Sequence, residues 1–301
     1  MKILVANDDG INARGIHELV SALSRVAEVY VSAPHVQRSA AGHGMTLSGS
    51  LFVREVEFEG AEKAYEVSGT PADCVKIGLY LLKRQGVAID MVFSGINHGG
   101  NLGTDTLYSG TVSAALEGNL KGYPAVAVSV DLAGRGGEPQ YFEYAAELAV
   151  KFAEWGFSGT YGCAGIGENC GENERGFAKF GKNITLNINV PDLPAAAIKG
   201  VKTGVLAKRA YLDNYMDITE SGSEGDGNSA DRSIHKESDN DKEGKTGYSY
   251  GGNLIDQFGL PEICDAGIIA GGYAAVTPIH TDLTDFSILG DISIITEFIA
   301  N

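Results

Sequence analysis

Short apolar runs alternate with helical periodicity through the first half of the chain. Residues 3–6 form an apolar run that is typical of a buried strand. The next apolar residues are spaced like one face of an amphipathic helix, and they are Ile16, Leu19, Val20 and Leu23. A second apolar run at 29–33 predicts another strand, which ends at Pro34.

Residues 70–73 predict the start of a helix, with Thr70 as the N-cap, Pro71 at the first helical position and Asp73 at the third. Further strands are predicted at 91–94, 125–130 and 184–190, and further helices at 111–120 and 141–155; order returns at 267–277. Strands that alternate with helices indicate βαβ units. We therefore expect an α/β protein with a Rossmann-like, largely parallel sheet flanked by helices.

The chain of 301 residues is long enough for one large core, and a single domain is expected over 1–301. Residues 1–200 would form the α/β core and 201–301 a C-terminal segment. A Gly- and Asn-rich stretch at 159–181 predicts a loop insertion. Residues 219–247 contain eight Asp or Glu and four Lys or Arg, and predict a mobile surface loop because burial cannot offset their ordering entropy.

Composition and charge narrow the class of protein. A net charge of −16 and the lack of a Lys/Arg cluster argue against nucleic acid or an anionic membrane as the main partner. No apolar run is long enough to cross a bilayer and no signal peptide follows Met1, so a cytoplasmic location is expected. The four cysteines form no Cys-x-x-Cys pair, so free thiols are expected.

Polar side chains follow three of the predicted strands. Asp8 and Asp9 come directly after the first strand, Ser39 lies in the loop after the second, and Asn97 follows the third. Because the carboxyl ends of parallel strands meet at one edge of a sheet, we expect these groups to lie together. Their oxygens form a set that suits Mg²⁺ or Mn²⁺ better than zinc. The alternative is an ordinary turn at Gly10 with an Asp that caps the next helix.

The stretch 95–111 is rich in glycine and leads into a predicted helix. Ser109, Gly110 and Thr111 would lie at the N-terminus of that helix, where backbone N–H groups bind anions. Long irregular loops inside compact domains are usually functional, which favours phosphate binding over a flexible loop with an ordinary Ser/Thr cap. The stretch contains neither a Walker A loop nor a G-x-G-x-x-G fingerprint.

A cation beside an anion site indicates hydrolysis of a phosphate ester. The cation would neutralise phosphoryl oxygens and lower the pKa of a bound water. The residues leave open whether that water attacks or Asp8 forms a covalent phospho-intermediate. His43 and His98 lie in glycine-flanked loops near the predicted site, and they are either acid–base groups or exposed loop histidines.

Several motifs together resemble the SurE family, the stationary-phase survival proteins. These motifs are Asn7-Asp8-Asp9-Gly10, Arg38-Ser39, Ser68-Gly69-Thr70-Pro71-Ala72-Asp73-Cys74-Val75 and the stretch 94–118. The resemblance is strong over 1–130 and resumes weakly at 189–191, Asp265, 272–273 and 276–278.

The resemblance implies a metal-dependent nucleotidase that hydrolyses nucleoside 5′-monophosphates, and 3′-monophosphates as well, to nucleoside and phosphate. It implies one Mg²⁺ or Mn²⁺ per subunit held by Asp8, Asp9, Ser39 and Asn97, with Asp8 and Asp9 as the catalytic residues. The expected substrate contacts are Asn7, Gly42, His43, Asn101, Ser109, Gly110 and Thr111. The resemblance also implies a homodimer or homotetramer in which C-terminal segments exchange between subunits.

Two other functions stay open on the sequence. A nucleotide-sugar or dinucleotide enzyme could use the same core, but the missing G-x-G-x-x-G opposes it. The chain could also be a non-catalytic metal- or nucleotide-binding protein with a stress-survival or interaction role. The sequence leaves open which nucleotide is the preferred substrate and whether Mg²⁺ or Mn²⁺ is the preferred metal.

Overall fold

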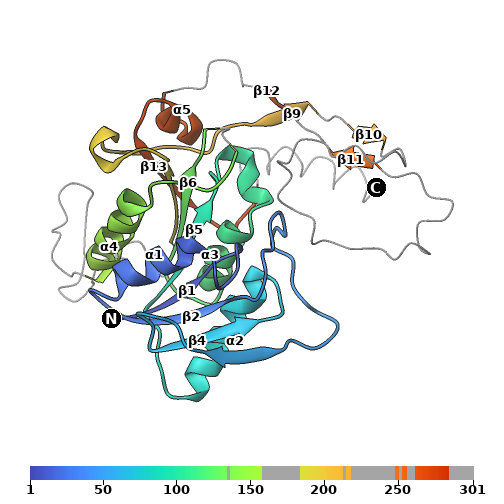
Figure 1. The fold of residues 1–301 in the computed structure, drawn as a ribbon, viewed down its shortest axis with the longest axis vertical. Coiled ribbons are helices and arrows are strands. Elements are labelled where there is room, and N and C mark those ends of the chain that lie inside the picture. Colours follow the sequence, from blue (N-terminus) through green and yellow to red (C-terminus); the bar gives the residue numbers. More distant parts are fainter. Residues whose placement is uncertain are drawn as a thin grey trace, which may run out of the picture.

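A nine-stranded sheet forms the centre of the fold (Figure 1). The computed structural model describes residues 1–133, 136–157, 184–212, 215–217, 248–250, 253–255 and 262–284. The strands of the sheet are β1 (Lys2–Ala6), β2 (Glu28–Pro34), β3 (Val53–Val56), β4 (Lys63–Val67), β5 (Met91–His98), β6 (Ala125–Asp131), β7 (Thr185–Pro191), β8 (Val201–Thr203) and β13 (Ala274–Ile279). They lie side by side in the order β3-β4-β2-β1-β5-β6-β7-β13-β8.

The strand order reverses at one point in the middle of the sheet. From β1 the chain builds outward through β2 and β4, and it then returns to place β5 on the other side of β1. The six strands from β4 to β7 are parallel, which confirms the predicted sheet, whereas β3 and β13 pair antiparallel with β4 and β7. Ligands of open α/β sheets bind outside the carboxyl ends of strands at such a switch point.

Two helices cover each face of the sheet. Helix α1 (Arg14–Leu23) packs against α4 (Glu143–Phe157) on one face, and α2 (Pro71–Arg84) packs against α3 (Gly110–Leu120) on the other (Figure 1). Each of these helices connects one parallel strand to another, as the alternating pattern predicts. A shorter helix, α5 (Asp265–Ala270), precedes β13.

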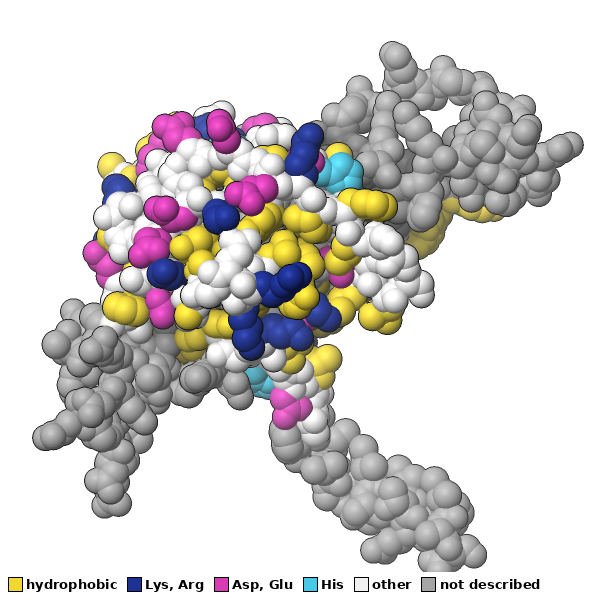
Figure 2. Space-filling model, turned by 90° about the horizontal axis from the view of Figure 1, so that it is seen from below, with side chains coloured by type: hydrophobic (Ala, Val, Ile, Leu, Met, Phe, Trp, Pro, Cys, Tyr) yellow, Lys and Arg dark blue, Asp and Glu magenta, His cyan; other side chains and the backbone are white. Residues whose placement is uncertain are grey.

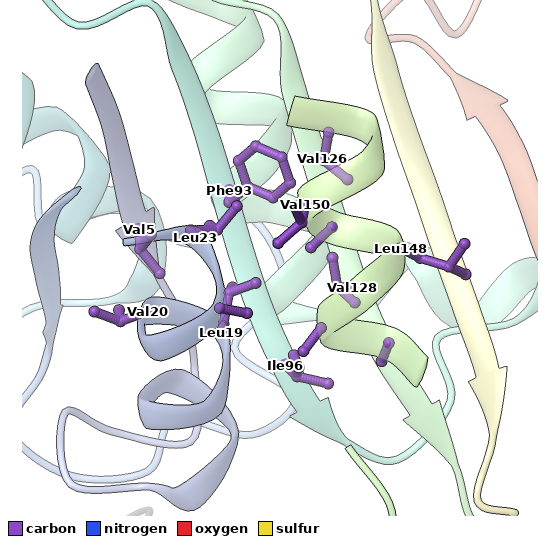
Figure 3. Close-up of a cluster of buried hydrophobic side chains, with 14 of the residues drawn as sticks. Val5, Leu19, Val20, Leu23, Phe93, Ile96, Val126, Val128, Leu148 and Val150 are labelled. Carbon is purple, nitrogen blue, oxygen red and sulfur yellow. The ribbon is translucent and has the colours of Figure 1, made fainter. Parts of the chain in front are cut away.

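The larger core lies between the sheet and the face covered by α1 and α4 (Figure 3). Leu19, Val20 and Leu23 of α1 are fully buried, as their helical spacing predicts. They belong to one cluster with Val5 of β1 and Phe93 of β5. Each such side chain contributes about 1.5–3 kcal/mol through burial of apolar surface, so this cluster fixes α1 on the sheet.

The N-terminus of α2 has the capping box that its sequence predicts. The hydroxyl of Thr70 accepts the N–H of Asp73 at 3.2 Å, and the Asp73 carboxylate accepts the N–H of Thr70 at 3.0 Å. The same carboxylate accepts the hydroxyl of Thr46 at 2.7 Å, so it also ties the loop after β2 to this helix.

Stability that depends on Asp73 is expected to vary with pH. Burial by itself would raise the pKa of this carboxyl, but hydrogen bonds from Thr46 and Thr70 outweigh burial and lower the pKa. The carboxylate therefore adds stability that is complete above the unfolded-state pKa of 3.8 and is lost as the pH falls through the lower folded-state pKa. We expect Asp73→Asn to reduce the free energy of unfolding at neutral pH by about 1.5–3 kcal/mol. Urea unfolding across the pH range would measure this difference, and a difference that does not shrink in acid would contradict the account.

The stretch 95–111 contains more regular structure than its glycines indicate. Strand β5 continues through a bulge between Ser94 and Asn97 as far as His98, and a 3₁₀-helix, η1 (Gly103–Leu107), follows. The prediction of an irregular loop over this whole stretch was therefore wrong. Strands β3 and β4 had not been predicted either, because short strands with half-exposed charged residues have weak periodicity.

Parts of the C-terminal segment belong to the same sheet, through β8 and β13. Two antiparallel pairs lie outside the sheet and project from it in Figure 1: β9 (Ala210–Leu212) with β12 (Asn253–Ile255), and β10 (Tyr215–Asp217) with β11 (Tyr248–Tyr250). The predicted loops at 159–181 and 219–247 lie outside the described residues. The role of the C-terminal segment in oligomerisation stays a prediction.

The surface carries charges of both signs. On the face that Figure 2 shows, acidic side chains lie mainly on one side, and Lys and Arg side chains gather among exposed hydrophobic ones on the other. Cys74 and Cys264 are buried free thiols, as predicted. Among the described helices, none combines the length and the apolar composition that a bilayer crossing requires.

Candidate metal and phosphate site

Asp8 lies at the carboxyl end of β1, against the N-terminus of α3. Its side chain is buried, and its Oδ1 accepts a hydrogen bond from the hydroxyl of Thr111. Gly110 comes so close that a Cβ at this position would lie 2.7 Å from the Cβ of Asp8. The helix end and the carboxylate are thus in direct contact, which the lack of a side chain at Gly110 permits.

Asp9 is held by groups that follow two other strands. Its Oδ2 accepts the backbone N–H of His98 at 3.0 Å, and its Oδ1 accepts Nε2 of Gln37 at 3.3 Å. Gly10 follows with a φ of +101°, a conformation that favours glycine. The side-chain amide of Asn7 donates to the carbonyl of Gly10 at 2.8 Å and closes the turn. The turn therefore holds both carboxylates at the switch point between β1 and β5.

The ionised forms of the two carboxylates are unfavourable in the absence of a bound cation. Burial raises the pKa of Asp8, and the neighbouring charge of Asp9 raises it further. Burial also raises the pKa of Asp9, and the hydrogen bonds from His98 and Gln37 only partly oppose this effect. In the described part of the chain, no Lys or Arg forms an ion pair with either carboxylate. A bound cation would offset this repulsion.

Ser39, a predicted ligand, lies in the loop after β2 and is half-buried. The backbone N–H of the preceding residue, Arg38, donates to the carbonyl of Asp8 at 2.7 Å. This bond brings the loop that carries Ser39 against the end of β1. Coordination by its hydroxyl stays a prediction.

Asn97 is the fourth predicted ligand and directly precedes His98, whose N–H binds Asp9. The amide nitrogen of Asn97 donates to the carbonyl of Gly99 at 2.8 Å. Its amide oxygen is therefore the end available to a cation. The loops that carry Asp8, Asp9 and Ser39 and the end of β5 that carries Asn97 meet at one edge of the sheet, as the parallel strands predict.

The N-terminus of α3 lies where the sequence predicts an anion site, and anion binding there stays a prediction. Ser109 is the N-cap residue, and its hydroxyl accepts the N–H of Val112 at 3.0 Å. The first N–H groups of a helix have no partner within the helix. Here the backbone of Thr111 hydrogen-bonds to Asp8, which opposes the rise in the pKa of that carboxyl. The arrangement places anion-binding groups beside the carboxylate pair.

Two predicted substrate contacts have buried side chains. Asn101 donates its amide to the hydroxyl of Ser129 at 2.8 Å, and its backbone N–H donates to Asn189 at 2.7 Å. Its carbonyl accepts the amide of Asn187 at 2.8 Å, so this network fixes the glycine-rich loop on β6 and β7. Asn7 is fully buried beneath the turn. Both residues have a structural role here, and their contact with substrate stays a prediction.

Gly42 and His43 pack against different parts of the α3 segment. The N–H of Gly42 donates to the carbonyl of Tyr108 at 3.0 Å, which borders the helix N-terminus. His43 lies 3.1 Å from the carboxylate of Glu117, six residues beyond Thr111 and about 9 Å farther along the helix axis. His43 is thus paired at a distance from the anion site, and contact of either residue with substrate stays a prediction.

Several groups around Asp9 were not predicted as part of the site: Arg14, Gln37 and Glu138. Glu138 lies 2.5 Å from Nδ1 of His98, whose Nε2 accepts the N–H of Gly15 at 3.3 Å. Burial lowers the pKa of His98, although Glu138 opposes this effect. His98 is therefore largely buried, with a contact at each of its two ring nitrogens, and it is not an exposed loop histidine. No local pattern could reveal this grouping, because its members come from four distant segments.

The donors at this edge fit a hard divalent cation. Its candidate ligands are the carboxylates of Asp8 and Asp9, the hydroxyl of Ser39 and the amide oxygen of Asn97, and among the described residues no group of three or more His, Cys, Asp or Glu gathers as a metal site. Oxygen ligands of this kind suit Mg²⁺ or Mn²⁺. The buried carboxylate of Asp8, the half-buried carboxylate of Asp9 and the adjoining helix N-terminus together can hold a cation and an anionic phosphoryl group.

Comparisons with known proteins point to one family. The family model described as Survival protein SurE matches residues 3–213. The 5′-nucleotidase SurE of Clostridium beijerinckii is 36% identical over 300 residues, covering 99% of this chain and 100% of the relative. That of Moorella thermoacetica is 40% identical over 288 residues, covering 95% and 93%. The crystal structure of the SurE protein from Aquifex aeolicus matches with a TM-score of 0.70 and 30% identity, over 98% of this chain and 100% of that one.

Proposed function

The chain belongs to the SurE family, and we propose that it is a 5′-nucleotidase that releases inorganic phosphate from nucleoside 5′-monophosphates. Relatives named 5′-nucleotidase SurE align with nearly its whole length, which supports this activity. The observation that carries the proposal is the contact between a buried carboxylate, Asp8, and the N-terminus of α3 at the switch point.

Nucleotidases of this family generally depend on a divalent metal. We propose one Mg²⁺ or Mn²⁺ per subunit, with Asp8, Asp9, Ser39 and Asn97 as its ligands. Asp8, which is buried, and Asp9, which is half-buried, support this assignment because neither pairs with a Lys or Arg among the described residues. A bound divalent cation would supply positive charge for the phosphoryl oxygens.

The side chains at the site have distinct roles in this proposal. Thr111 donates to one oxygen of Asp8 and so fixes the orientation of that carboxylate. The N–H groups of Gly110 and Thr111 would bind the phosphate, with Ser109 as the helix cap. Asp8 and Asp9 are the proposed catalytic residues, and either a water or Asp8 itself supplies the nucleophile.

Other expectations from the sequence stay predictions. They are activity on 3′-monophosphates, the homodimer or homotetramer, and the cytoplasmic location. The expected partner is the nucleoside monophosphate substrate. The net charge of −16 argues against nucleic acid as a partner.

Metal removal tests the proposed function. We expect the protein to release phosphate from AMP in the presence of Mn²⁺, to lose this activity in excess EDTA, and to regain it when Mn²⁺ is restored. A colorimetric phosphate assay would measure all three conditions. Equal release with and without EDTA would refute the metal dependence, and no release from any nucleoside monophosphate would refute the nucleotidase.

A further inference from the structure

A cavity of about 570 Å³ lies beside Asp9. Its walls come from the loop between β1 and α1, the loop after β2, the end of β5 and the segment that carries Glu138. Small-molecule sites typically measure about 300–1,000 Å³, so the cavity has the size of a ligand site. It shares Asp9 with the proposed metal centre, and a substrate held at that centre could extend into it.

The charges that line the cavity disfavour a second phosphate. Apart from Asp9, whose charge the proposed cation would offset, the lining carries the carboxylate of Glu138 and the guanidinium of Arg14, which pairs with Glu18 at 3.2 Å. An additional anionic group would meet more negative than positive charge there. A neutral ligand with hydrogen-bonding groups fits this lining better.

The lining offers both donors and acceptors. Nδ1 of His35 lies 3.3 Å from the carbonyl of Val67, so Nδ1 carries the proton and Nε2 is left as an acceptor. The guanidinium of Arg14 lies 4.9 Å from the ring centroid of Phe142. Its Nε donates to Glu18 at 3.2 Å, and its terminal nitrogens supply further donors. The amide of Gln37 supplies both kinds of group. Nucleobases and ribose carry complementary donors and acceptors and no charge.

We propose that this cavity binds the base and ribose of the nucleotide while the phosphate lies at the carboxylate pair and the N-terminus of α3. The proposal rests on the proposed function and adds where the nucleoside is recognised. Arg14, His35 and Gln37 are the residues that would distinguish a nucleotide from a simple phosphate ester.

The test compares two substrates that share the phosphate monoester and differ in the nucleoside: AMP and p-nitrophenyl phosphate. Ala13 is a half-buried residue in the cavity wall, so Ala13→Phe would fill the space. His35→Leu removes the acceptor. His17→Leu is the matched control, because His17 lies on α1 and stacks on Phe58 at 4.2 Å, away from the cavity lining.

We expect Ala13→Phe to lower kcat/KM for AMP by about tenfold or more, and that for p-nitrophenyl phosphate by about twofold at most. His35→Leu should lower kcat/KM for AMP by about fivefold, mainly through a higher KM. In the control His17→Leu, the ratio of kcat/KM for AMP to kcat/KM for p-nitrophenyl phosphate should change by less than about twofold. Adenosine should inhibit AMP hydrolysis competitively, and more weakly in Ala13→Phe.

An equal loss for both substrates in Ala13→Phe and His35→Leu, or no loss for either, would overturn the proposal. Tyr108 offers a competing location, because this exposed aromatic ring directly precedes the N-cap of α3. If Tyr108→Ala lowers kcat/KM for AMP more than for p-nitrophenyl phosphate, and the cavity variants do not, the nucleoside binds at Tyr108 and the proposal is overturned. A wild-type protein inactive on both substrates would refute the proposed function and, with it, this inference.

Discussion

Asp8→Asn is expected to reduce phosphate release from AMP by about a thousandfold, the upper end of what one charge-stabilising group in a preorganised site contributes. The amide keeps the shape of the carboxylate and still accepts from Thr111, but it cannot hold a divalent cation in the same way. Steady-state kinetics in Mn²⁺, together with calorimetric titration of Mn²⁺, would measure both losses. Full activity in this variant would reject the metal centre.

Thermal unfolding of Asp8→Asn distinguishes loss of the metal centre from misfolding of the variant. Burial and the charge of Asp9 raise the pKa of Asp8, so its ionised form costs stability in the metal-free protein at neutral pH. Asp8→Asn should therefore unfold at the same or a higher temperature than the metal-free wild type. Asp90→Asn is a matched control at the opposite end of β5, where Asp90 accepts the N–H of Lys2 at 2.7 Å, and it should keep wild-type activity.

Gly110→Ala is expected to lower kcat by about a hundredfold, since misplacement of reacting groups by about 1 Å has effects of this size. The added Cβ would lie 2.7 Å from the Cβ of Asp8 and 2.8 Å from its Oδ2. Either the carboxylate or the N-terminus of α3 must then move, and both belong to the proposed site. Kinetics with AMP and affinity for inorganic phosphate would measure the change.

Gly118→Ala supplies the control on the same helix. Its Cβ would lie 2.7 Å from the Cβ of Val92, so it introduces comparable crowding two turns from the site. We expect this variant to lose stability while its kcat stays close to that of the wild type. If the two variants lose activity in parallel with stability, the contact between Gly110 and Asp8 has no special part in catalysis.

Much of the core architecture follows from local pattern. The spacing of Leu19, Val20 and Leu23 predicted α1, and Thr70 with Asp73 predicted the capped start of α2. These predictions succeed because burial and capping act within one or two turns of chain. Parallel strands joined by helices also require Asp8, Asp9, Ser39 and Asn97 to approach one edge, so their loops could be grouped before the fold was known.

Other features depend on contacts between distant segments. Gly103 at the start of η1 is held by Asp265, 162 residues away, through a hydrogen bond of 2.8 Å. Asn101 lay within the predicted substrate-binding stretch, yet its amide bonds to Ser129 on β6. His43, a predicted substrate contact, pairs with Glu117 on the side of α3. None of these pairings leaves a periodic signal in the sequence.

The sequence by itself determined the largely parallel sheet and the edge at which polar groups gather, and it predicts the kind of cation that these groups suit. These depend on residue type and on short-range geometry. Only the tertiary structure decided that α3 ends against Asp8, that His98 and Gln37 hold Asp9, and that a cavity opens beside them. Such contacts join segments that meet through packing of the whole core, and packing selects among side-chain arrangements that local sequence leaves equivalent.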